Sequence, residues 1–163
     1  MKRLALTAAA VLVATGTASA EWKMVEDGDT TMIYTAGMKD GAAILSCDAS
    51  GKLSLSIAMG DLPVEEAMGR ESNRLRKRTG RLMVDGKEAF EGWFDYNPFS
   101  QLAETGQRGA ASKVYNATIK GQRVSFDLTS KGEVGMTLPP VDDAFRKFAT
   151  DCRDPYRAYR KDD

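Results

Sequence analysis

A tryptophan between two carboxylates is the group of side chains in this chain that best fits a recognition site. The stretch 90–99 holds five of the thirteen aromatic residues of the sequence. Side chains alternate between the two faces of a strand, so Glu91, Trp93 and Asp95 would share one face. An indole flanked by carboxylates can stack on a sugar ring while the carboxylates accept hydrogen bonds from its hydroxyl groups. We therefore predict a binding surface at Glu91, Trp93 and Asp95, with ordinary strand packing and one surface tryptophan as the alternative interpretation.

The two carboxylates of this group are poorly placed for hydrolysis. Glu91 and Asp95 are four residues apart, which is ~13 Å between their α-carbons at a strand rise of about 3.3 Å per residue. The carboxyl groups of glycosidases are separated by ~5–9.5 Å. The chain also contains no histidine, which excludes Ser-His-Asp and Cys-His arrangements and histidine metal sites. We predict no catalytic residue, no metal site and no cofactor.

A second candidate group is basic. Six lysine and arginine residues are accompanied by a single acid between residues 70 and 81. If residues 73–79 are extended, Arg74, Arg76 and Arg78 share a face and form a recognition stripe for anionic lipid head groups, acidic glycan or a partner's acidic patch. The alternative is a charged edge strand, in which positive side chains discourage aggregation. Over the whole chain 23 basic residues balance 23 acidic ones, so net charge gives no support to a nucleic-acid partner.

The first twenty residues have the pattern of an export signal. Two basic residues precede an apolar run from 4 to 13, and a small-x-small pattern that a signal peptidase accepts ends at Ala20. The run is far shorter than the ~20 residues needed to cross a bilayer. We predict a signal peptide at residues 1–20, cleavage after Ala20, a periplasmic location, and no transmembrane segment in the mature chain.

Export also decides how the two cysteines are interpreted. An oxidising compartment favours a disulfide between Cys47 and Cys152 over two free thiols. Their separation excludes a Cys-x-x-Cys redox motif. A cross-link that closes a loop of about 100 residues contributes up to roughly 4–5 kcal/mol on the chain-entropy model. We predict a structural disulfide.

The elements that position these groups are mostly short strands with alternating apolar residues. The clearest is 52–59, where Leu53, Leu55 and Ile57 share a face and polar or small residues occupy the other. Asp85-Gly86 is a strong signal for a hairpin turn. About eight strands are expected, at 30–36, 42–47, 52–59, 81–84, 88–96, 113–119, 123–128 and 133–138.

The end of the mature chain has a helical period. Pro139-Pro140 ends the last strand, and apolar residues then repeat at helical spacing up to Cys152. We predict a loop with one or two helical turns at 61–73, and a flexible charged tail at 153–163. The predicted fold is mainly β, a single β-rich domain over 21–152 built as an antiparallel β-sandwich or open barrel with a short C-terminal α-helix.

Several pieces of the chain resemble two families of small periplasmic proteins. The VasI-like accessory family of type VI secretion clusters is similar at Trp22, 44–47, 52–55, 125–128 and 143–152. The invasion-associated locus B family is similar at the Asp-Gly-Lys hairpin of 84–87 and at 124–148, although its four-cysteine pattern is absent here. The resemblance implies a non-enzymatic envelope or secretion-associated role and supplies no catalytic residue.

These observations predict a non-enzymatic periplasmic binding or accessory protein of the bacterial cell envelope or of a secretion system. Its expected partner is an envelope protein or glycan. Two alternatives remain open, a carboxylate-dependent enzyme that acts on envelope glycan and a secreted hydrolase inhibitor.

Overall fold

The computed structural model describes residues 20–70 and 74–153. Within these ranges the strands form one antiparallel sheet in the order β1-β2-β3-β4-β7-β6-β5-β8-β9. The strands are β1 (Trp22–Asp27), β2 (Thr30–Thr35), β3 (Ala43–Cys47), β4 (Leu53–Ala58), β5 (Arg76–Val84), β6 (Lys87–Asn97), β7 (Leu102–Thr105), β8 (Val124–Leu128) and β9 (Gly132–Met136). The helices are α1 (Val64–Met68), α2 (Arg108–Lys120) and α3 (Asp143–Arg153).

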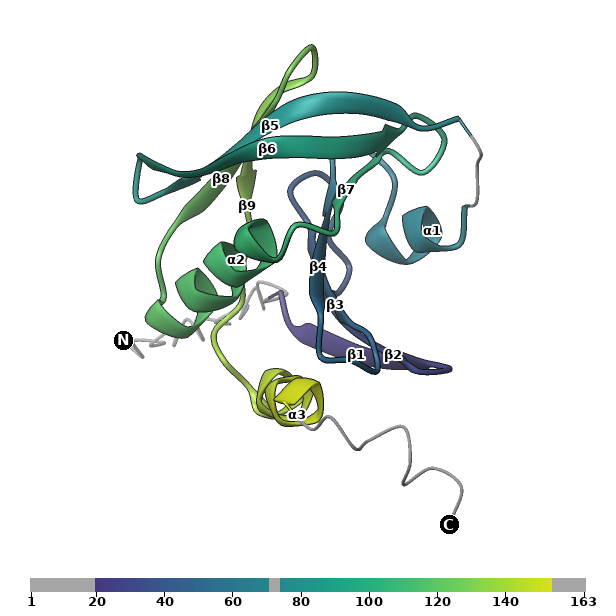
Figure 1. The fold of residues 1–163 in the computed structure, drawn as a ribbon, viewed down its shortest axis with the longest axis vertical. Coiled ribbons are helices and arrows are strands. Elements are labelled where there is room, and N and C mark those ends of the chain that lie inside the picture. Colours follow the sequence, from purple (N-terminus) through teal and green to yellow (C-terminus); the bar gives the residue numbers. More distant parts are fainter. Residues whose placement is uncertain (1–19, 71–73, 154–163) are drawn as a thin grey trace, which may run out of the picture.

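The predicted fold class is confirmed. The sheet curls into a half-barrel, with α2 on its concave side and α3 beside β1 and β2 (Figure 1). Since all nine strands belong to one sheet, the open barrel is the correct form of the two that were predicted. At the open side, the end of β9 approaches the start of β3, where Ala42 forms an isolated bridge with Thr137.

The predicted strand at 113–119 is wrong, because these residues belong to α2. Residues buried along α2 recur at helical spacing and form the stripe that faces the sheet: Ala110, Ala111, Val114, Ala117 and Thr118. Gly121 ends the helix in a left-handed conformation with φ of 63°, as glycine commonly does at this position. Strands β1 and β7 were not predicted.

The main core lies between the concave face of the sheet and the two longer helices. Phe94 of β6 and Phe126 of β8 pack with ring centroids 4.6 Å apart. Tyr115 of α2 stacks on Phe145 of α3 at 5.2 Å, and Trp22 of β1 packs on the same phenylalanine at 5.3 Å. These aromatic contacts join β1, α2 and α3 on one side of the sheet.

A smaller core lies on the outer face, where α1 covers one end of β2, β3 and β4. It contains Tyr34, Ile44 and Ala58 from the strands and Val64 and Ala67 from the helix. The short helix agrees with the helical turns expected at 61–73, of which residues 71–73 lie outside the described ranges.

The predicted disulfide is confirmed. Cys47 at the end of β3 is bonded to Cys152 in the last turn of α3, with α-carbons 5.7 Å apart. The bond ties the C-terminal helix to β3, the third strand in the sheet order. Residues 1–19 of the predicted signal peptide and residues 154–163 of the predicted tail lie outside the described residues. In the described ranges no helix has the length and apolar character needed to cross a membrane.

Candidate functional site

The predicted binding residues lie on the outer face of β6. Phe94 and Tyr96 point into the core, and the alternation of the strand therefore turns Glu91, Trp93 and Asp95 outward. Trp93 is 57 % exposed, whereas the other tryptophan, Trp22, is 4 % exposed. Trp93 thus presents a large aromatic surface to solvent.

Glu91 belongs to a row of alternating charges across three strands. It lies directly opposite Arg81 of β5, which lies directly opposite Asp127 of β8. The guanidinium of Arg81 donates a hydrogen bond to Asp127 at 2.5 Å. This hydrogen bond is the main reason that the pKa of Arg81 is raised, and Glu91 adds a smaller contribution. The charge of Glu91 is therefore accounted for by its position opposite Arg81 in the sheet, without a ligand.

Asp95 faces a different neighbour, Glu104 of β7. The two residues are directly opposite each other in the antiparallel pair of β6 and β7, a position in which β-carbons are about 4.5–5.5 Å apart. Both line a hollow of about 380 Å³ on the outer face, together with Met32, Ser46, Ser54, Leu55, Ser56, Leu75, Thr105 and Gly106. Trp93 lies two residues from Asp95 on the same face of β6.

The charge of Glu104 is not compensated. Partial desolvation in the hollow and, second, the charge of Asp95 raise the pKa of Glu104, and within the described residues no cation offsets them. Asp95 of β6 has Lys77 of β5 opposite it on one side and Glu104 of β7 opposite it on the other. Lys77 is therefore separated from Glu104 by the whole of β6. Like charges directly opposite each other destabilise a sheet. The pair is therefore suited to a ligand that brings a positive charge or hydrogen-bond donors.

The remainder of the hollow offers hydroxyl groups and an apolar rim. The hydroxyls of Ser46 and Ser54 are hydrogen-bonded to each other at 2.7 Å, and Ser56 lies opposite Glu104. Leu75 at the rim is 53 % exposed. In the ranges 20–70 and 74–153 no group of three or more histidine, cysteine or acidic residues could hold a metal ion.

Sequence reasoning missed Glu104. The four residues of β7 are too few to show a period. The pairing of β6 with β7 across the turn at 98–101 sets Glu104 beside Asp95, and this register is visible only in the folded sheet. An acid that closely follows an aromatic strand and a turn is the one local signal that could have indicated it.

The predicted basic stripe lies elsewhere. Arg76 and Arg78 are directly opposite Tyr96 and Phe94, and so belong to the inner face of β5 and β6. Arg74 precedes β5 and is exposed. Pairing of β5 with β8 begins only at Gly80, so the arginines occupy a part of β5 that pairs on one side, as the edge-strand interpretation requires. The arginine stripe and the Trp93 surface therefore lie on opposite faces of the sheet.

Comparison with protein-family models, with curated proteins and with solved structures finds no match to this chain.

Proposed function

We propose that this chain is an exported, non-enzymatic binding protein of the bacterial cell envelope, and that it binds its partner through the outer face of β6 and β7. The observation that carries the proposal is the like-charged pair of Asp95 and Glu104 beside the exposed Trp93, in which Lys77 faces Asp95 but, within the described residues, no cation lowers the pKa of Glu104. Such a pair costs stability, and groups of this kind are typical of functional sites. The export pattern of residues 1–20 and the disulfide support a location outside the cytoplasm.

The chemistry of this surface favours a positively charged partner, such as a basic segment of an envelope protein. A lysine or arginine side chain would compensate Asp95 and Glu104 in the hollow. The indole of Trp93 offers a face for stacking or for a cation–π contact, and Leu75 gives the rim an apolar contact. Aromatic residues surrounded by polar groups are typical of interface centres.

A binding experiment with defined ligands tests this proposal. Residues 21–163 would be titrated with short peptides of basic, neutral and acidic composition and with soluble peptidoglycan fragments. The signal is tryptophan fluorescence, because Trp93 is exposed and Trp22 is buried. We expect basic peptides to bind, and Glu104→Gln to weaken their binding at least tenfold. Trp93→Ala should also weaken binding of the basic peptides. Because this variant lacks the exposed fluorescent side chain, its binding would be measured by calorimetry.

Glu88→Gln is the matched control, since Glu88 is an exposed carboxylate on the same strand that lies opposite Met83. It should bind basic peptides as the unaltered chain does. Equal binding of basic and acidic peptides, or unchanged binding by Glu104→Gln, would contradict the proposal. Binding of glycan fragments alone would replace the protein partner with a glycan.

One observation favours a second candidate function, hydrolysis of envelope glycan. Directly opposite carboxylates can reach the separation of about 5–5.5 Å used by retaining glycosidases. The raised pKa of Glu104 suits a proton donor, and Asp95 would then be the nucleophile. Purified peptidoglycan would release new reducing ends with the unaltered chain, and Glu104→Gln would abolish the release. No release would leave the binding function alone.

A further inference from the structure

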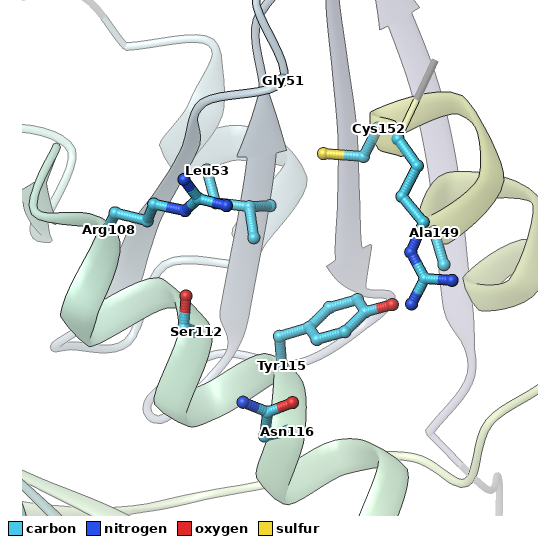
Figure 2. A pocket seen from close by; sticks show the side chains of 9 residues that line it. Gly51, Leu53, Arg108, Ser112, Tyr115, Asn116, Ala149 and Cys152 are labelled. Atoms are coloured by element: carbon cyan, nitrogen blue, oxygen red, sulfur yellow. The ribbon is translucent and has the colours of Figure 1, made fainter. Parts of the chain in front are cut away.

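A second cavity lies on the opposite side of the sheet, between α2 and α3. It has a volume of about 250 Å³ and is lined by residues of β4, α2 and α3, including Leu53, Arg108, Tyr115, Cys152 and Arg153. Figure 2 shows Arg108, Ser112 and Asn116 along the near side of α2, and Tyr115 reaching from α2 toward α3. Its volume is below the range of about 300–1,000 Å³ that is typical of ligand pockets, so it suits only a small ligand.

The charge of this cavity is positive. Arg108 and Arg153 both line it, and its lining contains no aspartate or glutamate. Within the described ranges neither guanidinium has a carboxylate partner. Two cations beside one cavity without an acid repel each other, and a bound anion would turn this repulsion into attraction.

Arg108 also occupies an electrostatically unfavourable position in α2. It is the first residue of α2, and the first turn of that helix contains no acidic residue. Gln107 at the N-cap provides no side-chain hydrogen bond to the helix. A helix N-terminus carries a partial positive charge, which makes it an unfavourable place for an arginine. An anion held by Arg108 would offset this cost.

The other walls provide hydrogen-bonding and apolar groups. The side chains of Ser112, Tyr115 and Asn116 line the cavity, and none of them has a side-chain hydrogen-bond partner among the described residues. Tyr115 is held in place by its stacking on Phe145. Leu53 and Ala149 add apolar surface. The disulfide fixes the end of α3, and with it the backbone of Arg153, against β3.

From these observations we propose that the cavity between α2 and α3 binds a small organic anion, a carboxylate or a phosphate monoester with a short apolar body. The anionic group is held by Arg108 and Arg153. The apolar body lies against Leu53, Ala149 and the ring of Tyr115. The site is on the concave side of the sheet, so it is independent of the proposed binding surface at Trp93 and Glu104.

Calorimetry with residues 21–163 tests the proposal with three probes: benzoate, phenyl phosphate and neutral benzamide. We expect at least one of the two anions to bind and benzamide to bind at least tenfold more weakly. Arg108→Gln and Arg153→Gln should each weaken binding of that anion at least fivefold. Lys113→Gln is the control, because it removes an equal charge from an exposed position of the same helix that does not line the cavity.

The alternative outcomes are distinct. Absence of binding by both anions overturns the proposal. Equal binding of benzamide shows that charge does not select the ligand, and an equal loss in Lys113→Gln shows that net charge alone is responsible; either result also overturns it. The arginines are exposed, and a circular dichroism melt of each variant separates a loss of binding from a loss of fold. Benzoate and phenyl phosphate distinguish the carboxylate from the phosphate form of the ligand.

Discussion

Glu104 is an exposed side chain whose charged form the fold disfavours. Its pKa in the folded chain is raised above the ordinary value of 4.5, first by desolvation and then by Asp95. The folded state therefore binds more protons than the unfolded state at pH values between 4.5 and the raised pKa. The stabilising contribution of this group is fully present below pH 4.5 and is lost as the pH rises through the raised pKa.

Replacement of this carboxyl group should therefore stabilise the protein in a pH-dependent way. We expect Glu104→Gln to raise the melting temperature at pH 7 and to leave it nearly unchanged at pH 3, where Glu104 is protonated. A like-charge pair across strands costs about 0.2–1 kcal/mol, which corresponds to roughly 1–5 °C. Differential scanning calorimetry at the two pH values measures the shift. Glu88→Gln should leave the melting temperature within about 1 °C at pH 7. If Glu104→Gln also left the melting temperature at pH 7 unchanged, the charge of Glu104 would not destabilise the fold.

Among the secondary-structure elements, α3 is held at its N-terminal end by one acidic side chain, Asp142. Asp142 precedes the helix, and its Oδ1 accepts a hydrogen bond from the backbone N–H of Phe145 at 2.9 Å. Its Oδ2 accepts a second one from the backbone N–H of Trp22 at 3.3 Å. The indole N–H of Trp22 also donates to the carbonyl oxygen of Pro139 at 3.0 Å. Asp142 thus caps α3 and fastens it to β1.

Loss of this cap should destabilise the protein. We expect Asp142→Ala to lower the free energy of unfolding by about 1–2 kcal/mol, the usual cost of an N-cap replacement, as measured by urea denaturation. Asp142→Asn retains a side-chain oxygen and should recover most of the stability. The neighbouring Asp143, which pairs with Arg146 on the surface, provides the comparison. If Asp143→Ala were as destabilising as Asp142→Ala, general helix electrostatics rather than the cap would account for the effect.

At the scale of the whole molecule, the disulfide between Cys47 and Cys152 links the C-terminal helix to the sheet. The two residues are 105 positions apart, so the bond closes a loop from the end of β3 to the last turn of α3. The contacts of α3 with β1 and β2 and the cavity between α2 and α3 both depend on the placement that it gives the helix. Long loops closed by a disulfide lose the most chain entropy in the unfolded state.

Removal of the bond should have a large effect on stability. We expect the double replacement Cys47→Ala and Cys152→Ala to lower the free energy of unfolding by about 4–5 kcal/mol. At about 3–5 °C per kcal/mol, the melting temperature falls by more than about 10 °C. Dithiothreitol should produce a similar fall in the unaltered chain and none in the double variant. An unaltered chain that melts equally with and without dithiothreitol would show that packing alone holds α3.

Local patterns were sufficient for much of the β structure. The alternation in β4, the Asp85-Gly86 turn between β5 and β6 and the helical period of α3 are each contained in a few consecutive residues. They predicted the fold class and the C-terminal helix, whereas the disulfide was predicted from the export pattern and from the presence of only two cysteines. The same signals were misleading at α2, because Gly121 fits a hairpin turn as well as a helix C-terminus. The helical stripe also begins at Ala110, before the range that was assigned to a strand.

The candidate sites were determined by tertiary structure to a greater extent. Sequence alternation placed Trp93 and Asp95 on one face, but the pairing of β6 with β7 put Glu104 opposite Asp95. Arg108 and Arg153 line one cavity although they are distant in the chain. Their meeting depends on how α2 and α3 pack on the sheet. Hydrophobic periods are local and specify which face of an element is buried. Strand register and helix packing join distant residues, so only the complete fold determines which charges share a site.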